Sequence, residues 1–128
     1  MGDKINTYKD LIAWQKSIVF VTSVYSLTKK FPADEKFGLV SQINRAVVSV
    51  TANIAEGWGR ELSKNYLQFL RTSRGSLMEV ETLLLISKNL KYIDDLSYDE
   101  ISIQIEEIGK ILQGLIKSVQ QKILTKAL

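Results

Sequence analysis

Apolar residues recur every three or four positions through four long segments of the chain. In the first segment the stripe consists of Leu11, Trp14, Ile18, Val21 and Tyr25. This spacing puts the side chains on one side of a helix and predicts an amphipathic helix over residues 8–30. Phe31-Pro32 ends this helix, because proline disfavours helical geometry in the residue before it.

The next two segments predict helices over residues 34–58 and 63–90. Asp34 is expected to cap the start of the first of these, and Gly59 to end it in a left-handed conformation. Ser63 is expected to be the N-cap of the other. The stripe of that helix consists of Tyr66, Phe69 or Leu70, Ser73, Leu77, Val80, Leu84 and Ser87.

The last segment has the most regular period. Its stripe consists of Ile101, Ile105, Ile108, Leu112, Leu115, Val119 and Ile123, and it predicts a helix over residues 98–125. Ser97 and Glu100 have the spacing of a capping box at its start. Four helices with short connections predict an all-α fold, an antiparallel up-down-up-down four-helix bundle in a single domain over residues 1–128.

The second predicted helix is unusual, because Arg45 and Glu56 are the only charged residues between Phe37 and Gly59. At about 100° per residue, three faces can be separated. The core face consists of Leu39, Ile43, Ala46, Val47, Val50 and Ile54. A polar stripe beside it consists of Gln42, Arg45, Ser49, Asn53 and Glu56. The third face, where solvent-facing charges are expected, consists of Asn44, Val48, Thr51, Ala52 and Ala55.

A helix with a neutral third face is typically covered on all sides. We therefore expect this face to pack against another copy of the chain in a homo-oligomer. A plain exposed surface of small residues is the alternative. The polar stripe, with Ser76 and Glu79 of the next helix, is expected to hold the two helices together, and Arg45 to pair with Glu79. A catalytic or ligand-binding role is the alternative for the stripe.

The composition narrows the chemistry available to the chain. It has no histidine and no cysteine, so Ser–His–Asp and Cys–His sites are excluded and the usual zinc, haem and iron–sulfur ligands are lacking. Glu56 and Glu79 could form a carboxylate pair, but no E-x-x-H motif accompanies them. We expect a non-enzymatic protein without metal or cofactor. With neither a long apolar run nor an apolar leader, it is expected to be cytoplasmic, with no membrane partner.

A net charge of +3 permits a polyanionic partner. The candidate nucleic-acid contacts are Arg60, Lys64, Arg71, Arg74, Lys110, Lys117, Lys122 and Lys126. We expect them to bind structured RNA, including rRNA, through its phosphates. Lysines near a helix carboxyl end also favour the helix dipole, which is the plain structural alternative. The other functional hypothesis is a protein-interaction scaffold that binds no nucleic acid and uses Trp14 and Trp58 as anchors for an unidentified protein.

Three stretches carry a family resemblance over nearly the whole chain. They are YKDLIAWQKS, FPADEKFGLVSQINRAVVSVTANIAEGWGR and YLQFLRTSRGSLMEVETLLL. In these stretches the chain resembles the 23S rRNA-intervening-sequence proteins, also called the four-helix-bundle protein family. The family positions matched here are Gln42, Arg45, Ser49, Asn53, Glu56, Gly57, Arg60, Gly75, Ser76 and Glu79. Val50, where isoleucine is usual, and Thr72-Ser73-Arg74 before the Gly-Ser pair are mild departures.

The resemblance implies a helical bundle that assembles into a homopentameric ring. It also implies an association with rRNA, since some members are encoded within insertions in bacterial large-subunit rRNA genes. A related group, the accessory proteins of diversity-generating retroelements, shares the bundle and is associated with nucleic acid and reverse transcriptase. The biochemical role of most members is undefined.

Overall fold

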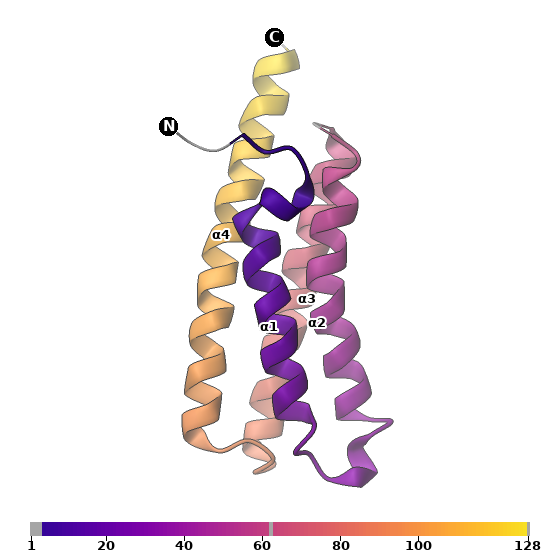
Figure 1. Ribbon diagram of the computed structural model, residues 1–128, viewed down its shortest axis with the longest axis vertical. Coiled ribbons are helices and arrows are strands. Elements are labelled where there is room, and N and C mark those ends of the chain that lie inside the picture. Colours follow the sequence, from indigo (N-terminus) through magenta and orange to yellow (C-terminus); the bar gives the residue numbers. More distant parts are fainter. Residues whose placement is uncertain (1–3, 62, 128) are drawn as a thin grey trace.

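The computed structural model describes residues 4–61 and 63–127, and these residues form helices and no strand (Figure 1). The elements are η1 (Tyr8–Asp10), α1 (Ile12–Thr28), η2 (Ala33–Glu35), α2 (Leu39–Trp58), α3 (Lys64–Asn89) and α4 (Asp95–Ala127). The four long helices pack side by side around one core: α1 contacts α2, α2 contacts α3, α3 contacts α4, and α4 contacts α1. The chain runs up and down between the two ends, which confirms the predicted helical bundle.

The interior of the bundle is mainly apolar, with a few buried serine and threonine hydroxyls. Its largest fully buried side chains include Phe20, Ile43, Ile54, Leu70, Leu84, Ile108 and Leu112. Burial of a side chain of this size stabilises the fold by about 1.5–3 kcal/mol, so this column dominates the stability of the bundle. The predicted stripe of α3 is buried as expected, with Leu70 rather than Phe69 facing inward. No helix in the described part of the chain is long and apolar enough to cross a membrane.

The inward face of α1 differs from the predicted stripe. The residues that face the core are Ala13, Ser17, Phe20, Val24 and Thr28. Ile18 and Tyr25, which were expected in the core, are 41% and 38% exposed. The helix carries two neighbouring stripes of apolar and small residues, and their period is the same. The spacing of the residues alone therefore could not decide which stripe faces the core. In the structure, the stripe that begins with the small residues Ala13 and Ser17 packs against α2 and α4.

Both ends of α2 also differ from the prediction. Asp34 lies in η2 instead of capping α2, which begins at Leu39. Glu35 takes over part of that role, because its Oε1 accepts a hydrogen bond from the Leu39 backbone N–H at 3.3 Å. At the other end Gly59 is right-handed, with φ −65°, and the left-handed conformation falls on Glu61, with φ 58°. The chain thus continues for two more residues before it reverses.

The start of α3 is as predicted, whereas that of α4 is not. Ser63 caps α3, because its Oγ accepts a hydrogen bond from the Tyr66 N–H at 3.3 Å. The expected Ser97–Glu100 capping box is wrong, since α4 already begins at Asp95. Asp94 caps it, and its Oδ1 accepts a hydrogen bond from the Ser97 N–H at 2.7 Å. This hydrogen bond stabilises the carboxylate and lowers the pKa of Asp94.

Candidate nucleic-acid interface

Three of the candidate cations line one groove between α3 and α4. Lys64 and Arg71 come from α3 and Lys117 from α4, and the groove has a volume of about 790 Å³. The other residues that line it are Leu67, Gln68, Gln120, Gln121, Ile123 and Leu124. None of these residues is acidic, so the groove has a positive potential over an apolar floor. We call it the α3–α4 groove.

The helical repeat explains why these cations meet. Lys64 and Arg71 are seven residues apart on α3, which places them on the same side of the helix and about 10 Å apart along its axis. Lys117 lies on the side of α4 that faces them, because α3 and α4 run antiparallel and the last turns of α4 stand beside the first turns of α3 (Figure 1). Leu67, only 8% exposed, anchors the floor of the groove to the core.

Arg74 and Lys110 lie near this groove but have other partners. Arg74 donates a hydrogen bond from Nη1 to Oε1 of Gln113 at 2.8 Å, which ties α3 to α4. Lys110 forms an exposed ion pair with Glu106 one turn away, with 3.1 Å between Nζ and Oε1. Exposed pairs of this kind contribute less than about 1 kcal/mol. Neither residue lines the groove.

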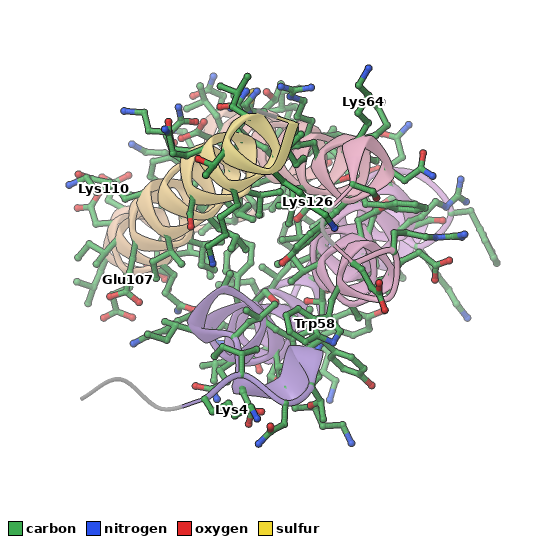
Figure 2. The ribbon with its side chains drawn as sticks, turned by 90° about the horizontal axis from the view of Figure 1, so that it is seen from above. Lys4, Trp58, Lys64, Glu107, Lys110 and Lys126 are labelled. Carbon is green, nitrogen blue, oxygen red and sulfur yellow. The ribbon has the colours of Figure 1, made fainter. Side chains whose placement is uncertain are left out.

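The lysines of α4 do not form one strip. Lys122 follows Lys117 by five residues, which turns it about 140° around the helix, and Lys126 lies close to the direction of Lys122. Both are exposed, but neither lines the α3–α4 groove. In the end view, Lys64 points away from the bundle whereas Lys126 points toward its middle (Figure 2). The basic end of α4 therefore presents cations in two directions.

Arg60 belongs to another surface, beside α2 and α3. Its Nη2 lies 3.0 Å from Oε1 of Glu56, and its guanidinium lies 5.3 Å from the centre of the Phe69 ring. The pair is about half exposed, so it orients Arg60 more than it stabilises the fold. Arg60 is thus separated from the cations of the groove by the width of α3.

The polar stripe of α2 meets α3 through small hydroxyls. Ser49 and Ser76 share a hydrogen bond of 2.8 Å between their Oγ atoms. Asn53 donates from Nδ2 to the Ser49 backbone oxygen at 2.8 Å and to its Oγ at 2.9 Å. The stripe therefore forms a hydrogen-bonded joint between the two helices.

The larger side chains of the same stripe lie outside this joint. Gln42, Arg45 and Glu79 are exposed, and no ion pair joins Arg45 to Glu79 in the described part of the chain. The predicted Arg45–Glu79 pair is wrong because both residues lie on the outer edge of the α2–α3 contact, where water solvates them. Their charges remain available at the surface.

The third face of α2 is partly covered within the chain itself. Thr51, 8% exposed, donates a hydrogen bond to Oγ of Ser17 at 2.9 Å, and Oδ1 of Asn44 accepts one from Oγ1 of Thr28 at 3.0 Å. These two residues therefore face α1 and not the outside, which corrects the predicted face. Val48, 43% exposed, and Ala52 do point outward, and Ala55 is half-buried.

A profile of the 23S rRNA-intervening sequence proteins matches residues 9–114. The chain belongs to this family. The resemblance found in the sequence motifs is thereby confirmed. Among solved structures, the chain is similar to a protein of unknown function from the S23 ribosomal protein family of Bacteroides thetaiotaomicron. The two are 28% identical with a TM-score of 0.76, over 83% of this chain and 96% of the other. No curated protein matches the chain.

Within this family member, α1 contributes an outer surface that the sequence argument missed. Its large exposed apolar residues are Ile12, Ile18, Val19 and Tyr25. The sequence signal for it is the one used for α2, namely the lack of charge: Lys16 is the only charged residue between Asp10 and Lys29. Ile12 lines a cavity with Ile111 and Leu115 of α4, and Val19, two turns later, lies on the same side of α1. We therefore define the α1–α2 outer face as Ile18, Tyr25, Val48 and Ala52.

Proposed function

We propose that this family member is a non-enzymatic, homo-oligomeric helical-bundle scaffold that binds structured RNA through the α3–α4 groove. The observation that carries the proposal is the meeting of Lys64, Arg71 and Lys117 in a groove without a carboxylate. Such cations bind phosphates and release condensed counterions, which gives an affinity that falls steeply with salt. The family name, which refers to 23S rRNA, supports rRNA as the class of ligand.

Self-association is proposed to occur through the α1–α2 outer face. Its apolar residues are exposed in the single chain, with Ile18 at 41% and Val48 at 43%. Few charges would need to be desolvated when a second copy covers this face. A pentameric ring, as the family resemblance implies, would present one groove per subunit and raise the avidity for a long RNA without any new contact.

A protein partner is the second candidate, favoured by the apolar floor of the same groove. Leu124 is 62% exposed beside Leu67 and Ile123. An acidic amphipathic helix could place apolar residues on this floor and carboxylates against the cations. RNA is preferred because the groove supplies charge along its length, and the uncharged polar residues Gln68, Gln120 and Gln121 suit a solvated ligand.

The test is the binding of a fluorescent RNA hairpin, measured by anisotropy at low and at physiological salt. Light scattering fixes the mass of the protein beforehand, and co-purified nucleic acid is removed. We expect Arg71→Glu to weaken binding by about tenfold or more, or about 1.4 kcal/mol, because it replaces a phosphate-binding cation by a carboxylate. Lys122→Glu makes the same kind of charge reversal on the other side of α4 and is expected to change binding less than about twofold.

Equal effects of the two substitutions would contradict the placement of the site in the groove. No binding at low salt by the intact oligomer would overturn the RNA proposal and leave the protein partner. An acidic amphipathic peptide that competes with the hairpin would show that both ligands use the same groove.

A further inference from the structure

A second cavity lies at the same end of the bundle as the α3–α4 groove. It has a volume of about 420 Å³ and is lined by Asn6, Trp58, Gly59, Glu61 and Tyr66. The N-terminal segment forms one side of it, and the connection from α2 to α3 forms the other. Trp58 ends α2 and Lys64 begins α3, so both lie at the end of the bundle where these two helices are connected. A volume of this size is within the range of small-molecule sites.

The cavity and the groove lie on different sides of the first turn of α3. Tyr66 lines the cavity, while its neighbours in sequence, Lys64 and Leu67, line the groove. A ligand that occupies both places has to pass over the start of α3. The two places differ in charge, since the groove has three cations and no carboxylate whereas the cavity has the carboxylate of Glu61 and no cation.

The groups that line the cavity suit a flat aromatic ligand with N–H donors. Trp58, half-buried, supplies an indole face, and Tyr66, 3% exposed, supplies a rigid wall. Burial raises the pKa of Tyr66, so its phenol stays neutral. Asn6 can donate and accept hydrogen bonds, and Glu61 can accept two from adjacent donors.

The backbone of Glu61 is the strained point of this region. Its φ of 58° is in the left-handed region, which is uncommon for a residue with a side chain. Such strain is often kept where a side chain must be held in place for a ligand. A hydrogen bond of 3.0 Å from the Glu61 N–H to the Trp58 carbonyl oxygen closes the backbone turn that holds this conformation.

We propose that this cavity takes an unpaired guanine base from an RNA whose backbone lies in the α3–α4 groove. This inference rests on the proposed function. Guanine carries two adjacent N–H donors on its Watson–Crick edge, which match a carboxylate, and its ring stacks on Trp58 in the manner of aromatic side chains that recognise unpaired RNA bases. The carboxylate repels phosphate, so the base enters the cavity while the phosphates stay on Lys64 and Arg71.

The experiment compares five RNA hairpins with one common duplex. One is blunt, and the others carry a single unpaired G, A, C or U at the 3′ end. Anisotropy titrations use the full chain in its natural oligomeric state. We expect the G hairpin to bind about tenfold more tightly than the blunt one, which corresponds to about 1.4 kcal/mol. A, C and U are expected to add less than about threefold.

Two variants separate the cavity from the groove. Glu61→Gln is expected to abolish the preference for G and to leave the affinity for the blunt hairpin unchanged. Arg71→Glu is expected to weaken all five hairpins by a similar factor and to keep the preference. Circular dichroism checks that both variants retain the helical content of the unsubstituted chain.

The outcomes distinguish the two proposals. If the blunt hairpin binds and the four unpaired bases have equal effects, the guanine site is overturned and the groove stands. If no hairpin binds, both proposals are overturned. An aromatic pocket with a carboxylate also suits a quaternary ammonium group. Quenching of Trp58 fluorescence in a Trp14→Phe background by tetramethylammonium, and not by guanosine monophosphate, would therefore overturn the guanine assignment as well.

Discussion

The two halves of this bundle have the same kind of core and opposite outer surfaces. In α1 and α2 the charged residues are Lys16, Arg45 and Glu56. In α3 they are Lys64, Arg71, Arg74, Glu79, Glu81 and Lys88. In α4 they are Asp95, Asp99, Glu100, Glu106, Glu107, Lys110, Lys117, Lys122 and Lys126. In this bundle one pair of helices, α1 and α2, has few charged residues, and the other pair, α3 and α4, has most of them.

Desolvation explains what each half is suited to bind. A protein partner that covers a surface must strip water from it, and burying an unpaired charge costs several kcal/mol. The α1–α2 outer face avoids that cost. The α3–α4 half keeps its charges in water, and the three cations of its groove can exchange counterions for a phosphate ligand there. This difference is the reason why association between copies is proposed on one side and nucleic-acid binding on the other.

The largest expected effect is on the free energy of unfolding, and it differs between the inner and the outer side of α1. Phe20→Ala removes a fully buried ring and is expected to lower the free energy of unfolding by about 3–5 kcal/mol. Ile18→Ala, on the outer face and 41% exposed, is expected to lower it by about 1 kcal/mol or less in a monomeric state. Urea unfolding followed by circular dichroism measures both. Equal losses would mean that α1 turns its predicted stripe toward the core after all.

The next prediction breaks the proposed association. Val48→Glu places a charge on the α1–α2 outer face, where it would be buried between copies. We expect the dissociation constant between subunits to rise at least about 100-fold, or about 2.7 kcal/mol. Light scattering would then approach the mass of one chain, 14.5 kDa.

Ile103→Glu is the matched control for this substitution. Ile103 is 68% exposed, but it lies on α4, outside the α1–α2 outer face. The assembly is expected to keep its mass in this variant. If Ile103→Glu dissociates the assembly and Val48→Glu does not, the association surface lies on the charged half.

A smaller effect on RNA binding is expected to distinguish two lysines of α4. Lys117 and Lys110 lie on the same side of α4, but only Lys117 lines the groove. Lys117→Ala is expected to weaken RNA binding by about tenfold and to reduce the slope of log affinity against log salt by about one. Lys110→Ala, which removes an exposed ion pair with Glu106, is expected to leave the slope unchanged. Anisotropy titrations at four salt concentrations give both slopes.

The smallest expected effect concerns acid stability at the ends of the helices. Hydrogen bonds from the Asn6 and Thr7 backbone N–H groups lower the pKa of Asp10, and the Ser97 N–H lowers that of Asp94. A lowered folded-state pKa stabilises the fold above the unfolded-state pKa, and this stabilisation is lost as the pH falls through the folded-state value. Asp94→Asn is expected to lower the melting temperature slightly at pH 7 and to leave it unchanged at pH 2. A difference that grows at acid pH would contradict the capping role.

Features of the candidate site that depend on neighbouring residues in the sequence could be predicted. Contacts between residues far apart in the chain could not. The charge-poor character of α2 was visible in the sequence, and the same signal applied to α1 would have indicated that α1 also has an uncharged outer surface. The hydrogen bond from Thr51 to Ser17 was not predictable, because it joins residues far apart in the chain at a distance set by the close approach of α1 and α2. The same holds for the meeting of Lys64 with Lys117.

The sequence by itself determined the four helices, the bundle, the inward faces of α2 and α3, and the family. These properties depend on the spacing of apolar residues and on how well each side chain is solvated. Both can be read directly from the amino-acid sequence. Only the tertiary structure decided which stripe of α1 turns inward, which cations share a groove, and that the left-handed residue after α2 is Glu61 and not Gly59. Those properties depend on the rotation and register of one helix against another, which arise when all four helices pack at once.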